Sequence, residues 1–454
     1  MARHPLTLLR ASVNLSHPAY ARLVAETHAD LGFGHMAARR EKVSRWESGR
    51  TVPELTAQIA IAHIHQVPEE AVTRLGWPYW LHLATSDAAL LTSPWTPDGA
   101  IDVLHGTARR ADAEPRSYLA VTGSAVASLS RASLAAVADW QPPPARDGRR
   151  VAPDTAAWIE TRIEALEAVE PPVSPAVLYP AARAEFRLIT GLLAGSGYDR
   201  KTGTWLFLLA ARAAALCGWF SDALGEEARG ERYYLAAIRA ATTAGARRWA
   251  SVYLSNLAAS HLAVGDPRDA VPLIGAARAI ARRPSPRLTA ALYIREARTH
   301  ARLGEAAAST RALDHAASTL AAGPGDWDPT IDPFVGNVDE DWLARSTGIT
   351  WLQIGRPERA LRHFTTLLDD GPSSHVPTLP FLPLARDLLH VVDAQIALGE
   401  LEAAVHSAGR AVAVFGSLPI GLLRRYRQRF APHRGVPAVR DLFDLLEEQP
   451  LSSV

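Results

Sequence analysis

The sequence predicts an all-α protein with two parts, an N-terminal helical domain and a long array of stacked helix pairs. From residue 151 to about 446 the chain is rich in Ala and Leu at helical spacing. Within that region a pattern of helix, glycine and helix recurs. Near the N-terminus, the stretch REKVSRWESGRTVPE at 40–54 predicts a short basic helix followed by stop signals.

The composition is typical of a soluble globular protein, with 48% hydrophobic and 21% charged residues among 454. The net charge of +1 excludes a general polyanion binder, so any nucleic-acid site must come from local charge asymmetry. The single cysteine, Cys217, excludes an intrachain disulfide and a cysteine metal cluster. We find no signal peptide and no membrane-spanning stretch, and therefore expect a cytoplasmic protein that does not bind membranes.

Four regions follow from the composition along the chain. Residues 1–84 are rich in His and Arg and carry helix signals. Residues 85–150 are expected to be a connecting region that ends in the linker QPPPARDGRR at 141–150, which proline stiffens and charge keeps solvated. Residues 151–446 form the expected α-solenoid, and 447–454 form a C-terminal tail.

Each repeat of the solenoid has a glycine, a short polar turn and a small residue five positions after the glycine. The glycine ends the first helix, where a positive φ costs little, and the small residue lets the second helix approach closely. One pair cannot bury its apolar stripe alone, so pairs must stack. The glycines are Gly225, Gly265, Gly304, Gly355 and Gly399, and the small residues are Gly230, Ala270, Ser309, Ala360 and Ala404.

This pattern resembles the tetratricopeptide repeat. The glycine separations of 40, 39, 51 and 44 residues exceed that family's repeat of about 34. We expect the excess in loops such as 323–337. A helical bundle without repeats is the alternative interpretation.

The basic helix at 40–48 has one apolar side. Val43 and Trp46 are three residues apart and share the face that points inward. Gly49 is placed to end the helix, and Pro53 to open the next helix at its first position. Between residues 37 and 50, five basic side chains stand against two acidic ones, a net charge of +3. Such a helix fits the DNA major groove, although many charged helix faces are merely solvated.

The string VSRWESG at 43–49, with its later Pro, resembles the third helix and turn of the Xre/lambda-repressor-type helix-turn-helix family. LLRASVNLSHPAYARLV at 8–24 resembles that family's first helix, link and start of helix 2, with Ser16 as the N-cap. PELTAQIAIAHIHQV and PEEAVTRLGW resemble helices 4 and 5. The resemblance covers residues 6–76 and implies a five-helix helix-turn-helix domain that binds double-stranded DNA.

Residues 25–38 depart from the family pattern because the chain between helices 2 and 3 is longer. We expect an extended helix 2 and a wider turn. The departure leaves open whether Arg39 belongs to the recognition helix or to the end of the loop.

The resemblance also implies roles for single residues. Arg10 and Glu47 would form a partly buried ion pair, which is costly to break. Base edges would be read by Arg40, Glu41 and Arg45. Phosphate or backbone contacts would come from Ser48, Arg50, Arg39, Lys42, Ser44 and His17.

Other constellations carry little chemistry. The N-terminal histidines show no recognised metal-ligand spacing, and no catalytic motif is present, so we expect no metal, no cofactor and no enzyme. Five residues on expected first helices of the solenoid could line a concave ligand groove: Arg248, Tyr253, Asn256, Arg295 and Arg298. The alternative is that they are ordinary buried or exposed side chains.

The architecture resembles actinobacterial Xre-type regulators that carry repeat domains. The resemblance implies a homodimeric transcriptional regulator, located on the nucleoid when bound to DNA. Its solenoid would sense a peptide, a small molecule or a protein partner. The alternative from another class is an interaction scaffold, in which the solenoid is the working part and DNA is not read specifically.

Overall fold

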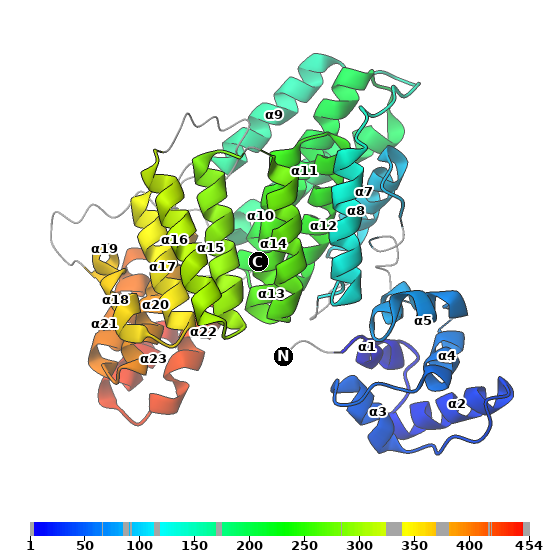
Figure 1. Cartoon of the computed structure of the whole chain (residues 1–454), viewed down its shortest axis with the longest axis horizontal. Coiled ribbons are helices and arrows are strands. Elements are labelled where there is room, and N and C mark those ends of the chain that lie inside the picture. The colour runs from blue at the N-terminus through cyan, green and yellow to red at the C-terminus, as the bar shows by residue number, and fades with distance from the viewer. Residues whose placement is uncertain are drawn as a thin grey trace.

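The computed structural model confirms an all-α fold built from helix pairs (Figure 1). It describes residues 4–65, 67–84, 90, 93–112, 119–168, 175–282, 284–323, 338–368, 381–415, 418 and 420–447. In these ranges the extended backbone is limited to two isolated bridges, between Arg146 and Tyr198 and between Arg150 and Gly197. The tail at 448–454 and most of the loop at 323–337 lie outside the described residues.

Five short helices and a 3₁₀ turn form the N-terminal domain, drawn in blue in Figure 1. They are α1 (Pro5–Ser12), α2 (His17–Asp30), α3 (Arg40–Glu47), α4 (Leu55–Ile64), α5 (Glu69–Leu75) and η1 (Tyr79–Ala84). Their shared core includes Tyr20, Val43, Trp46 and Trp80. The Trp80 indole donates to Gln58 Oε1 at 3.1 Å, which fixes η1 against α4.

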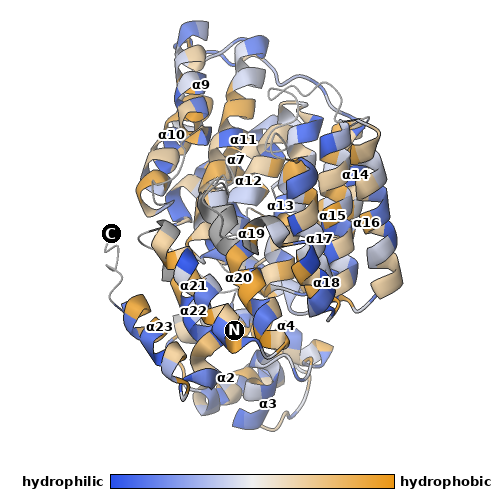
Figure 2. Cartoon of the chain, turned by 90° about the vertical axis from the view of Figure 1, so that its left-hand side faces the viewer, coloured by the Kyte–Doolittle hydropathy of each residue, from blue (hydrophilic) through white to orange (hydrophobic). Residues whose placement is uncertain are grey.

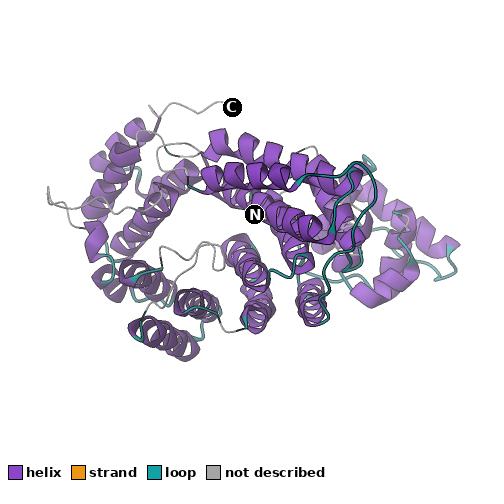
Figure 3. Ribbon diagram, turned by 90° about the horizontal axis from the view of Figure 1, so that it is seen from above, coloured by secondary structure: helices purple, strands orange, loops and turns teal. Residues whose placement is uncertain are grey.

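Among the described residues, the array that follows contains five antiparallel helix pairs. They are α11 (Arg200–Ala223) with α12 (Glu227–Thr243), α13 (Arg247–Val264) with α14 (Pro267–Ala281), α15 (Pro286–Arg302) with α16 (Ala306–Ala321), α17 (Glu340–Gln353) with α18 (Pro357–Arg362), and α20 (Phe381–Ala397) with α21 (Leu401–Phe415). Helices α9 (Pro153–Glu167) and α10 (Pro175–Gly195) precede them. The short α19 (Thr365–Leu368) lies between the last two pairs, and α22 (Ile420–Phe430), η2 (Ala431–His433) and α23 (Pro437–Glu447) end the array. Figure 3 shows the helices set along an arc.

Four of the five repeat glycines have the expected positive φ, between 78° and 80°. Gly265 differs, because it is the C-cap of α13 with φ −104°. A Cβ there would lie 2.9 Å from His261 Nδ1 and 2.9 Å from Leu119 Cδ1, so close packing excludes a side chain. All five small residues are buried, as expected for close helix contact. At Gly230 an added Cβ would lie 2.4 Å from Asp222 Oδ1.

The described residues of the region at 85–150, expected as a connection, pack onto the array of helix pairs. Helices α7 (Pro97–Arg110) and α8 (Ser124–Ala138) contact α10, α12 and α14 and share one hydrophobic core with them. The linker at 141–150 is also held, since the Arg146 and Tyr198 backbones exchange hydrogen bonds of 2.8 and 2.9 Å. The apolar faces of α7 and α8 need a partner surface, and the array of helix pairs supplies it.

Two hydrophobic cores run along the array. One extends from Leu90 to Val338 and the other from Ile349 to Leu446, and Trp351 packs against both. In Figure 2 the helices carry both hydrophilic and hydrophobic residues, as amphipathic helices in a layered array do. Helix α11 is long and apolar enough to span a bilayer, but 78% of its most apolar 18-residue window is buried against other helices of the fold.

Candidate nucleic-acid interface

Buried side chains anchor α3 and orient its polar face. Val43 and Trp46 lie in the core of the N-terminal domain. Arg39 is the N-cap with an extended backbone and no side-chain cap bond, so it ends the loop and does not belong to the helix. The helix therefore begins at Arg40.

The exit from α3 is a glycine-terminated turn. Gly49 has φ 70°, its N–H donates to Trp46 O at 3.1 Å, and Arg50 N–H donates to Arg45 O at 3.0 Å. Pro53 does not open the next helix, contrary to expectation: α4 begins at Leu55 after an extended Glu54. The Pro53 carbonyl instead accepts from Gln58 Nε2 at 2.8 Å.

The longer segment before α3, at residues 25–38, consists of additional turns of α2 followed by a turn that a hydrogen bond holds. Helix α2 begins after the Ser16 N-cap and runs to Asp30. Gly32 and Gly34 both have positive φ, and His28 Nδ1 lies 3.0 Å from Gly34 O. The buried His28 therefore ties this turn to α2.

The side chain of Glu47 is held by Arg10 and His17. Arg10 Nε donates to Glu47 Oε1 at 2.6 Å, and Arg10 Nη1 donates to Leu15 O at 2.7 Å. His17 Nε2 lies 2.9 Å from Glu47 Oε2. Burial raises the pKa of Glu47, but the hydrogen bonds from Arg10 and His17 outweigh it and hold that pKa below its usual value. His17, expected at the DNA backbone, is thus directed to this ion pair.

The outward face of α3 and its exit carry exposed polar residues. They are Arg39, Arg40, Glu41, Ser44, Arg45, Ser48 and Arg50, while Lys42 is half-buried. Arg40 Nε donates to Glu41 Oε1 at 2.9 Å, and their side chains are 72% and 60% exposed. Hydrogen bonds from its own backbone amide and from Arg40 lower the pKa of Glu41. Such an exposed pair contributes little to stability, so both groups can exchange partners.

Two features of this domain were not predicted from the sequence. Arg22 is exposed on α2. Tyr20 Oη lies 2.9 Å from His65 Nε2, and this contact joins α2 to α4.

The five expected groove residues do not share one environment. Tyr253 is wholly buried beside Trp249, and its burial raises its pKa well above the usual value, so it is a core residue and does not line a groove. The others are half-buried on α13 and α15: Arg248, Asn256, Arg295 and Arg298. Arg295 Nε donates to Ser255 Oγ at 3.4 Å.

Across the described part of the chain, no three His, Cys, Asp or Glu side chains gather as metal ligands would. Cys217 is fully buried, and burial raises its pKa, which makes its thiol unreactive.

No known family model matches this chain, and no curated protein is significantly similar to it. Its function is therefore inferred from its own fold and site.

Proposed function

We propose that this protein is a transcriptional regulator that binds duplex DNA sequence-specifically through the outward face of α3. One observation carries the proposal. Arg45 and Arg50 are exposed, while Val43 and Trp46 fix the same helix from the inside. A rigid helix with a free basic face is what major-groove recognition requires.

The division of charge on α3 supports this proposal. Glu47 is neutralised inside the domain by Arg10, so it does not offset the basic side chains outside. Arginine can bond bidentately to guanine, and a glutamate can accept from cytosine. This arrangement also agrees with the resemblance to Xre-type helix-turn-helix domains.

We further propose a homodimer located in the cytoplasm, because one short recognition helix reads few base pairs and a two-fold dimer reads two half-sites. In this proposal the solenoid responds to an effector and has no enzymatic role. Light scattering of the protein with and without DNA tests the dimer. A monomer under both conditions contradicts it.

Selection from a random duplex pool tests the DNA proposal. We expect the full chain to enrich one sequence at moderate salt. Its affinity for that sequence should fall steeply as salt rises, because each phosphate contact releases counterions. An Arg50→Ala variant should show a smaller salt slope than the wild type. If no sequence is enriched, the DNA proposal fails and the scaffold function replaces it.

A further inference from the structure

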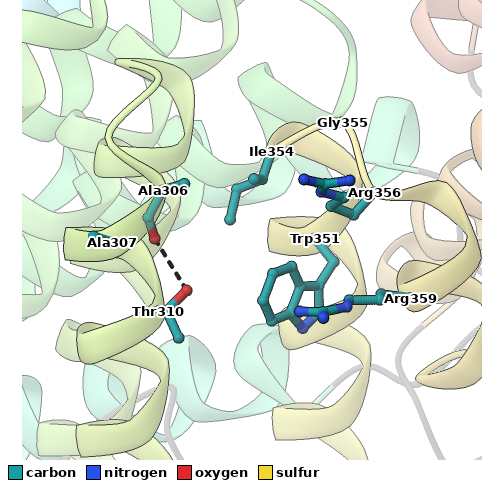
Figure 4. Close-up of a pocket in the computed structure, with 8 residues that line it drawn as sticks. All are labelled: Ala306, Ala307, Thr310, Trp351, Ile354, Gly355, Arg356 and Arg359. Carbon is teal, nitrogen blue, oxygen red and sulfur yellow. Dashed lines mark hydrogen bonds between the residues drawn. The ribbon is translucent and has the colours of Figure 1, made fainter.

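A pocket of about 680 Å³ lies where α16 faces α17 and α18 (Figure 4). Its volume is in the range of small-molecule sites, roughly 300–1,000 Å³. It is lined by Ala306, Ala307, Thr310, Trp351, Ile354, Gly355, Arg356 and Arg359. Figure 4 shows the alanines and Thr310 on one wall, with Trp351 and the two arginines on the other.

The lining combines two cations with an apolar surface and has no acidic residue. Arg356 and Arg359 are both exposed. Neither arginine makes an ion pair within the part of the chain that the structure describes. The Arg359 guanidinium lies over the Trp351 ring, 4.8 Å from its centroid, which leaves its N–H groups available at the edge.

We propose that this pocket binds a small organic anion with a flat apolar body. A carboxylate or phosphate headgroup would lie between the Arg356 and Arg359 guanidiniums, which suit such groups in charge and geometry. The apolar body would pack against Ile354, Trp351 and the alanine wall of α16. This inference rests on the proposed sensory role of the solenoid and names its ligand class.

The position of the pocket gives the ligand a means to act. Ala312 and Ala316 of α16 belong to the first hydrophobic core, and Trp351 packs against both cores. A ligand that contacts both α16 and α18 favours the relative placement of the two cores in which its affinity is higher.

Calorimetric titration of the full chain with three naphthalenes tests the site. The probes are 2-naphthoate, 2-naphthyl phosphate and neutral 2-naphthol. We expect the anions to bind at one site and the naphthol to bind at least about ten-fold more weakly, since it makes no charge-assisted bonds. Whichever anion binds tighter distinguishes a carboxylate from a phosphate ligand.

Matched variants locate the binding. Arg356→Gln with Arg359→Gln should weaken both anions at least about ten-fold and leave naphthol unchanged, which also shows that the pocket is intact. Arg302→Gln with Arg311→Gln removes the same charge from exposed positions outside the pocket and should change nothing. Ala307→Trp should fill the pocket and abolish binding of all three probes. Unchanged anion affinity in the first double variant overturns the proposal.

Titration with the selected duplex, with and without the tighter anion, separates this site from the proposed function. A change in DNA affinity that the Arg356/Arg359 double variant loses supports the sensory role. Anion binding with unchanged DNA affinity overturns that role. Failure to bind any specific duplex overturns the DNA proposal alone, because the anion titrations contain no DNA.

Discussion

Two helices of this protein both carry arginine and glutamate and use them in opposite ways. In α3 the Arg40 and Glu41 side chains are 72% and 60% exposed and contact each other at the surface. In α12, Glu231 is fully buried and Arg239 is only 3% exposed. The first set is available to a partner molecule, and the second is already bound within the chain.

The partners of Glu231 and Arg239 are backbone groups of residues that precede the helix array. Glu231 accepts from the N–H groups of Ala120 and Val121 at 2.6 and 2.9 Å. Arg239 donates to the carbonyls of Leu90, Ser93 and Pro94 at 2.9–3.2 Å. A charged helix residue therefore indicates a recognition surface only where its side chain remains exposed to solvent.

The largest effect is expected at the buried carboxylate. Glu231→Ala should lower the free energy of unfolding by about 3–5 kcal/mol, because it leaves two buried N–H groups unpaired. Urea denaturation measures this loss. The exposed Glu402→Ala should stay within about 0.5 kcal/mol of the wild type. Equal effects would contradict the assigned difference between buried and exposed charge.

An intermediate effect is expected at the ion pair between Arg10 and Glu47. Arg10→Met should destabilise the N-terminal domain by about 2–3 kcal/mol, since it leaves Glu47 partly desolvated. Hydrogen exchange of the amides in α1 to α5 measures it. Adding Glu47→Gln should cost less than the sum of the two single changes, because the pair is coupled. Strict additivity would show that the pair contributes nothing.

The ion pair between Arg10 and Glu47 should also make the stability of the N-terminal domain depend on pH. The native pKa of Glu47 lies below its unfolded value of 4.5, so its contribution to stability is present above pH 4.5 and is lost as the pH falls through the native pKa. Glu47→Gln should remove this acid sensitivity of the domain.

At the exposed face, Arg45→Ala should weaken specific DNA binding by about 1–3 kcal/mol and relax one base position. It should leave the free energy of unfolding within about 0.5 kcal/mol, because the side chain is exposed. The control is Arg74→Ala, an exposed arginine on α5. Equal losses for both variants would indicate nonspecific charge attraction and not recognition by α3.

Local patterns in the sequence predict the elements that local chemistry controls. The spacing of Val43 and Trp46 predicts the buried side of α3, and Gly49 predicts its end. Four of the repeat glycines also end their helices with the predicted positive φ. At Gly265 a side chain would instead collide with Leu119, which is distant in the sequence and could not be predicted as a neighbour.

Contacts between distant segments could not be predicted in the same way. The Arg-rich sequence of α12 gives no sign that Glu231 and Arg239 bind the backbones of distant residues. These are Leu90, Ser93, Pro94, Ala120 and Val121. The packing of α7 and α8 on the array of helix pairs depends on these long-range contacts. Tyr253 was expected to line a groove but is fully buried. Helix periodicity alone does not reveal which face of a helix another layer covers.

The last expected effect is a pH dependence of stability at Asp269, a second carboxylate that holds the segment before α8. Asp269 Oδ1 accepts from Gly123 N–H at 2.8 Å. An added Cβ at Gly123 would collide with the Tyr79 hydroxyl of η1, so the held loop lies directly against the N-terminal domain. Burial raises the pKa of Asp269 from 3.8 to about 6, with a further contribution from Asp266.

Because this pKa is raised in the native state, Asp269 stabilises the fold fully below about pH 4, and that contribution is lost as the pH rises through about 6. His261, with Nδ1 3.7 Å from Asp269 Oδ2, has the opposite dependence, since burial lowers its pKa from 6.5 to about 4. Asp269→Asn keeps an acceptor for Gly123 and removes one titration. The stability of the wild type relative to this variant should therefore fall between pH 4 and 6 and stay constant above 7. Urea denaturation across this range measures it, and a constant difference throughout would show that Asp269 titrates as an exposed carboxylate does.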